Sequence, residues 1–180
     1  MPTFKEMTDY IISLGAADLD HSDKTYLAHN IGVYNDLKKW DAPEDLCRAG
    51  LFHSIYGTQQ FQGFTLSLER QQELRELIGD YAEKIAYVNC FMDRATLDAQ
   101  LTQPEGPYTI IHRESREEII LNKQEYDDLA RLHLCDWLEQ VERSGDWGQR
   151  REAYRNMAER LGGVALASYD EVFAREPLTA

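Results

Sequence analysis

Two histidines stand at core-facing positions of two consecutive predicted helices, and this feature constrains the fold more than any other. In the first of these helices, His29 shares a face with Val33 and Leu37 at the four-residue spacing of an amphipathic helix. In the second, His53 stands on the apolar face. Placing an imidazole in a core costs free energy unless it is hydrogen-bonded or ligates a metal. Because a short capped turn joins the two helices, we expect the imidazoles to converge on one buried site.

Periodicity and capping signals predict a mainly α fold with seven or eight helices and one β-hairpin. The patterns Thr3-x-x-Glu6 and Asn122-x-x-Glu125 are capping boxes that start the first helix and a long late helix. Short β-branched runs on either side of a polar turn predict the hairpin at residues 108–121. The predicted helices cover residues 3–15, 22–40, 41–57, 67–79, 80–101, 122–143, 147–161 and 164–174.

The chain length fits a single domain over residues 1–180. Within it, residues 1–103 are predicted to form the helical core that holds the histidine site, and residues 104–180 a hairpin with a C-terminal helical extension. Gly50 lies inside the third predicted helix, where glycine is costly. A close approach of the second and third helices near the histidines would account for it.

Charge and cysteine content exclude several classes of partner and compartment. The net charge of −13 repels nucleic acid, and no dense basic patch offsets it, so we expect no nucleic-acid partner. No apolar run approaches the roughly 20 residues that span a bilayer, so no membrane partner is expected. The three cysteines are far apart and odd in number, which favours a reducing compartment and predicts a cytoplasmic protein.

Residues 21–58 resemble the N-terminal part of the HD superfamily of metal-dependent phosphohydrolases, nearest its (p)ppGpp-hydrolase branch. The resemblance rests on the segments YLAHNIGVY and AGLFHSIYGT, in which His29 matches the first histidine ligand and His53 the second. As a whole, the chain resembles an uncharacterised HD-like family. The resemblance implies an HD-like helical bundle, a divalent metal, and catalytic roles for both histidines.

The chain departs from that pattern at the positions that support phosphate chemistry. The aspartate of the HD doublet is replaced by Ser54, and the acidic pair that follows falls on Gly57 and Thr58. Serine is a poor ligand for a divalent ion and does not neutralise its charge. We therefore expect no hydrolysis of (p)ppGpp or of simple phosphomonoesters.

The last ligand of the superfamily is an aspartate on a later helix, and two alignments of that helix are possible. One alignment places Asp93 at the position, and the other places Tyr87 there. The two residues cannot share a role, because six residues span about 240° of a helix. We favour Asp93, which would give a set of His29, His53 and Asp93. Two imidazoles and one carboxylate with open positions suit Fe(II), Mn(II) or Zn(II). With Tyr87, the pocket would act without a metal.

The sequence is compatible with three functions: two of them use a pocket at the histidines, and the third is a protein-interaction role. The first is an HD-derived, metal-dependent enzyme, a hydrolase, lyase or oxygenase, that acts on a small polar molecule. The second is a metal-free small-molecule binding protein with a degenerate HD pocket. The third is an interaction module in which the hairpin and C-terminal helices form a homodimer face.

His133, on the apolar face of the long late helix, is expected to be a core histidine bonded to a neighbour. The predicted substrate pocket consists of Ser54, Tyr56, Thr58, Tyr87 and His112.

Overall fold

The computed structural model describes residues 2–21 and 24–177, and most of them are helical. The helices are α1 (Phe4–Ser13), α2 (Tyr26–Lys39), α3 (Glu44–Leu51), α4 (Gln71–Ile78), α5 (Asp80–Phe91), α6 (Arg94–Asp98), α7 (Lys123–Ser144), α8 (Arg151–Leu161) and α9 (Gly163–Phe173). A short 3-10 turn, Leu68–Arg70, precedes α4. The strands are β1 (Asp20–His21), β2 (Lys24–Thr25), β3 (Tyr108–Ile111) and β4 (Glu118–Leu121), paired in sequence order as two antiparallel ribbons. The prediction of a mainly α fold with a small hairpin is confirmed, and β1–β2 is a further small ribbon.

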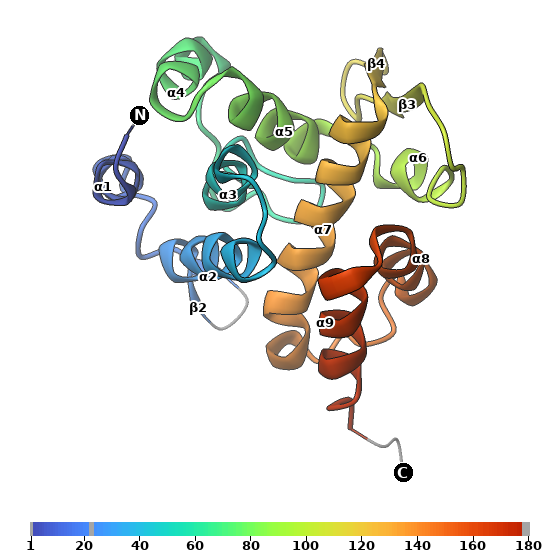
Figure 1. Cartoon of the computed structure of the whole chain (residues 1–180). Coiled ribbons are helices and arrows are strands. Elements are labelled where there is room, and N and C mark those ends of the chain that lie inside the picture. Colours follow the sequence, from blue (N-terminus) through green and yellow to red (C-terminus); the bar gives the residue numbers. More distant parts are fainter. Residues whose placement is uncertain (1, 22–23, 178–180) are drawn as a thin grey trace.

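The long helix α7 organises the molecule (Figure 1). It contacts α2, α3 and α5 on one side and α8 and α9 on the other. The helices α2 and α3 approach closely at Gly50, where an added Cβ would lie 2.5 Å from Leu37 Cδ1 and 3.3 Å from Val33 Cγ1. The expected close approach is therefore confirmed, and it brings the two histidine-bearing segments together beside α7.

The predicted helix over residues 80–101 is interrupted. Helix α5 ends at Phe91, and Met92 adopts an extended conformation that bridges to His112 beside the hairpin. The Asp93 N–H donates to the Ile111 carbonyl at 2.8 Å, so the hairpin is hydrogen-bonded to the backbone at the point where the helix is interrupted. Asp93 then caps α6 by accepting a hydrogen bond from the Ala95 N–H. The prediction of one continuous helix was wrong, because the backbone of Met92 and Asp93 pairs with the hairpin instead of continuing the helix.

The third helix, predicted over residues 41–57, is shorter in the structure: α3 ends at Leu51, and the backbone beyond it forms i+3 turn hydrogen bonds, such as Ile55 N–H to the Phe52 carbonyl. His53 therefore lies in a turn and not on a helix, contrary to the prediction.

Most of the other predicted boundaries agree with the structure to within a few residues. The capping boxes at Thr3 and Asn122 are present at the starts of α1 and α7. The hairpin pairs Tyr108 with Leu121 and Ile110 with Ile119. The expected start of the second helix at residues 22–23 lies outside the described residues, and α2 is capped by Thr25. Among the helices described, none has the length and apolar character needed to cross a membrane.

Candidate metal centre

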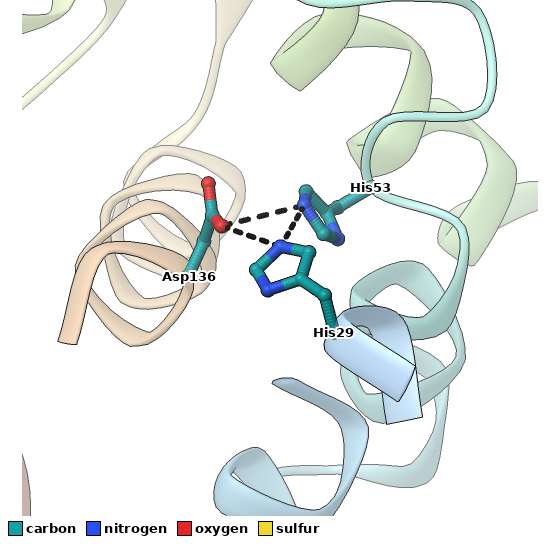
Figure 2. A group of neighbouring side chains, drawn as sticks. All are labelled: His29, His53 and Asp136. Atoms are coloured by element: carbon teal, nitrogen blue, oxygen red, sulfur yellow. Dashed lines mark hydrogen bonds and ion pairs between the residues drawn. The ribbon is translucent and has the colours of Figure 1, made fainter. Parts of the chain in front are cut away.

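Three side chains from separate segments converge on one buried point (Figure 2). His29 comes from α2, His53 from the turn that follows α3, and Asp136 from the middle of α7. Their exposed fractions are 0%, 1% and 7%. The His29 Nε2 atom lies 3.3 Å from His53 Nε2 and 3.1 Å from Asp136 Oδ1, and His53 Nε2 lies 3.4 Å from the same oxygen. The two nitrogens and the oxygen form a nearly equilateral triangle.

The triangle has the size of one face of a metal coordination sphere. Ligand atoms about 2.0–2.2 Å from one ion, in tetrahedral or octahedral arrangement, lie about 2.8–3.6 Å from one another. The three measured separations fall within that range. The group can therefore hold a metal ion with little movement of its side chains.

The remaining ring nitrogens are held in place by acceptors. His53 Nδ1 lies 2.8 Å from the Gly50 carbonyl oxygen, which can only accept a hydrogen bond, so this nitrogen carries the proton. His29 Nδ1 lies 2.6 Å from Glu139 Oε2. Such partners fix the tautomer and the ring orientation of metal-ligating histidines. In the neutral form of each ring, the Nε2 lone pair therefore points into the triangle.

Electrostatics favour a positive charge in this group. Burial opposes protonation of His29, but hydrogen bonds and charge from Asp136 and Glu139 outweigh it and raise the pKa of His29 to about 9. Burial likewise opposes ionisation of Asp136, and the two histidines outweigh it and hold its pKa well below the ordinary value. A proton or a metal ion between the lone pairs would relieve their mutual repulsion.

Glu139 supports His29 from one turn further along α7. Its carboxylate is only 4% exposed, and it pairs with Lys24 at 2.6 Å and with Arg143 at 2.7 Å. Burial raises its pKa, but His29, Arg143 and Lys24 outweigh this and lower it to about 2. Gly32 provides the space, because an added Cβ there would lie 2.6 Å from Glu139 Oε1.

The predicted third ligand, Asp93, is engaged elsewhere and Asp136 stands beside the histidines instead. Asp93 caps α6 and forms an ion pair with Arg116 at 2.9 Å, with its side chain 24% exposed. Its alternative, Tyr87, lies next to His112, with 3.2 Å between the hydroxyl and Nε2. The candidate group therefore also draws on residues beyond residue 103, since α7 supplies Asp136.

A cavity of about 420 Å³ opens on the His53 and Asp136 side of the group. Of the predicted pocket residues, Ser54 and Thr58 line this cavity. The other three lie elsewhere. Tyr56 donates a hydrogen bond to Glu83 at 3.0 Å, Tyr87 lines a separate hollow, and His112 stacks on Phe91 with ring centroids 4.8 Å apart. The hairpin at His112 therefore does not cover the histidine site.

His133 is a core histidine, as expected. It is 1% exposed, and its Nδ1 lies 3.3 Å from Asn89 Oδ1. Its Nε2 accepts a hydrogen bond from Arg150 at 2.6 Å. Asn89 in turn donates to the His53 carbonyl at 2.8 Å, so this chain of hydrogen bonds anchors the backbone of a candidate ligand.

The sequence carried a signal for Asp136 that residue-by-residue alignment missed. Leu129, Leu132 and His133 define the buried stripe of α7, and Asp136 continues that stripe at the i+3 and i+4 spacing. A carboxylate in such a stripe needs a cationic or hydrogen-bonding partner. The stripe therefore marks Asp136 as a buried carboxylate that needs a partner, and only the packing of α7 shows that the partners are the two histidines.

Comparison with known proteins gives a partial likeness. Residues 10–94 are similar to a family model described as a domain of unknown function (DUF6817). That span is less than half of the chain; it includes both histidines and stops before α7. Neither curated proteins nor solved structures gave a match.

Proposed function

We propose that this protein is a metal-dependent enzyme, HD-derived as residues 21–58 suggest, which acts on a small polar molecule. One divalent ion binds to His29, His53 and Asp136. The observation that carries the proposal is the triangle of three acceptor atoms, with both Nδ1 atoms committed to partners. Three lone pairs aimed at one buried point need a cation between them.

The ligand set and the cavity limit the chemistry. Two imidazoles and one carboxylate leave coordination positions open, which suits Fe(II), Mn(II) or Zn(II). The cavity beside His53 and Asp136 gives a small molecule access to those positions. An ion held there would polarise a bound substrate or activate water, so the reaction is that of a hydrolase, lyase or oxygenase. Ser54, Gly57 and Thr58 argue against simple phosphomonoesters as substrates.

Metal content of the purified protein tests the proposal. The full chain is prepared without chelator, supplied separately with Fe(II), Mn(II) and Zn(II), and dialysed before its metal is counted. We expect about one equivalent of a preferred ion, and loss of that ion in His53→Ala and in Asp136→Asn. The matched control is Asp93→Asn, which alters an aspartate outside the triangle and should keep the metal. Retention of metal by Asp136→Asn, or its absence from the wild type, contradicts the proposal.

A metal-free binding protein is the second candidate, and one observation favours it. The His29 and His53 rings and Asp136 lie within hydrogen-bonding distance of one another, so a proton can occupy the position assigned to the metal. In that case, the wild type would hold no metal and the cavity would bind its ligand without turnover. The metal count separates the two candidates.

A further inference from the structure

Arg94 is a buried cation that lines the same cavity as His53 and Asp136. It is only 6% exposed, and its Nε atom is buried with no hydrogen-bond partner. In the described part of the chain, no hydrogen bond or ion pair reaches its guanidinium. The nearby Asp98 carboxylate is paired with Arg150 instead. Asp136 already faces the two histidines and accepts a hydrogen bond from Gln140 at 3.0 Å.

Burying an unpaired guanidinium is costly, so its retention calls for an explanation. Arginine stays protonated in proteins, although burial lowers the pKa of Arg94. Another residue that lines the cavity, Trp137, also has a buried polar atom without a partner among the described residues, its indole nitrogen. The cavity wall therefore offers donors that the fold leaves unused.

The charges around the cavity restrict the anion that Arg94 would bind. Its lining includes three aspartates, Asp20, Asp136 and Asp146, and Arg94 is the single cation among the lining residues that the structure describes. With a divalent ion bound, these charges balance. A phosphate dianion would then add two uncompensated negative charges, whereas a carboxylate adds one. Asp20 and Asp146 provide acceptors for hydroxyl or amino groups of the same molecule.

We propose that Arg94 is the carboxylate-binding residue of this cavity, and that the substrate is a small carboxylic acid that also bears hydroxyl or amino groups. The planar guanidinium presents two parallel N–H donors that match a carboxylate. The carboxylate is held at Arg94 while the polar remainder reaches the metal side of the cavity at His53 and Asp136. This inference rests on the proposed function for its reaction; the carboxylate contacts Arg94 and not the metal, although the charge of the ion favours its binding.

Calorimetric titration of the full chain, metal-loaded and metal-free, tests this assignment. The probes are acetate, D-glycerate, L-serine and gluconate, with glycerol as the neutral counterpart and inorganic phosphate as the competing anion. We expect at least one hydroxy or amino acid to bind better than glycerol and phosphate. In Arg94→Gln that binding should weaken about 10- to 100-fold, the usual worth of a charged hydrogen bond. Arg94→Lys, which keeps the charge but not the fork, should fall between the two.

The matched control is Arg155→Gln, which changes an exposed arginine on α8 that pairs with Glu159. It should bind the probes as the wild type does. Metal content is counted for every variant, and Arg94→Gln should keep the metal. If the wild type holds no metal but binds a carboxylate in an Arg94-dependent way, the proposed function fails and this inference stands. Tighter binding of phosphate, equal binding by Arg94→Gln, or no carboxylate binding to the wild type overturns it.

Discussion

Two buried histidine clusters lie against α7, and they differ in the charges that surround them. In the carboxylate cluster, His29 faces Asp136 and Glu139. In the arginine cluster, His133 accepts a hydrogen bond from Arg150 and lies beside Asn89. Both imidazoles are almost fully buried, at 0% and 1% exposure.

The neighbours drive the two histidines to opposite charge states. The carboxylates raise the pKa of His29 to about 9 against the effect of burial. For His133, burial together with the positive charges of Arg150 and Arg94 lowers the pKa well below its ordinary value. Burial alone therefore does not make a histidine a candidate ligand. A cation site needs carboxylates beside the ring, and arginines turn the same residue into a neutral structural bridge.

The largest effect should come from removing the structural bridge. His133→Ala removes the partner of Asn89 Oδ1, takes an acceptor from Arg150 and opens a cavity. We expect a loss of about 3 kcal/mol in the free energy of unfolding. Metal content should stay at the wild-type level, because the ligand side chains are untouched.

Urea unfolding measures the cost, and His133→Gln is the matched control. Its amide can accept from Arg150 and donate to Asn89, so it should recover more than half of the loss. If His133→Ala folds normally but binds no metal, the arginine cluster contributes directly to the metal site and the two clusters have no separate roles.

A smaller effect should follow from disturbing the support of His29. Glu139→Gln removes the negative charge beside His29 Nδ1, and Gly32→Ala forces the Glu139 carboxylate aside. Loss of such a partner typically weakens metal binding about 10- to 100-fold. Gly32→Ala should lower the stability of the fold slightly, because moving the buried carboxylate weakens its pairs with Lys24 and Arg143 and the better helix propensity of alanine offsets only part of this loss.

Competition for the ion with a chelator of known affinity gives the change in Kd, and thermal unfolding gives the stability. The two readouts separate ligand positioning from folding. Unchanged metal affinity in both variants would mean that Glu139 serves only to pair with Lys24 and Arg143 and does not position His29.

The arginine cluster should also contribute to acid sensitivity. The folded pKa of His133 lies well below 6.5, its value in the unfolded chain. Above pH 6.5 neither state binds the proton, so His133 makes no contribution to pH dependence. Below pH 6.5 the unfolded state binds a proton at His133 that the folded state does not bind. The free energy of unfolding therefore falls by up to about 1.4 kcal/mol per pH unit.

Denaturant unfolding at several pH values between 7.5 and 5 measures this slope. The difference between wild type and His133→Gln isolates His133, since the other titrating groups are common to both. The wild type should lose stability more steeply below pH 6.5. Parallel curves would show that His133 takes up its proton in the folded state.

The parts of the site that could be predicted are those whose signal is local in sequence. His29 and His53 interrupt short apolar stripes, and Gly50 marks the close approach of α2 and α3. The hairpin and the capping boxes likewise depend on a few adjacent residues. Each of these features can be recognised within one helix or one turn.

The third member of the candidate metal group could not be found in that way, because its position depends on tertiary pairing. The break between α5 and α6 exists because the Asp93 N–H pairs with Ile111 of the hairpin, some distance along the chain. Without that break, Asp93 falls inside a helix beside apolar residues and resembles a buried ligand. Asp136, more than 80 residues from His53 in the sequence, meets it only through the packing of α7.

Asp93→Ala should have the smallest effect and gives the sharpest contrast with Asp136. Its side chain accepts from the Ala95 N–H and pairs with Arg116 at 2.9 Å, so the variant loses an N-cap and an exposed ion pair. The expected cost is about 1 kcal/mol of folding stability, because α6 is short and the ion pair is screened by solvent.

Asp93→Asn should recover most of this stability, since asparagine caps helices as well as aspartate does. Neither variant should change the number of metal ions bound. Loss of metal in both variants, at unchanged stability, would return Asp93 to the ligand set and displace Asp136 from it.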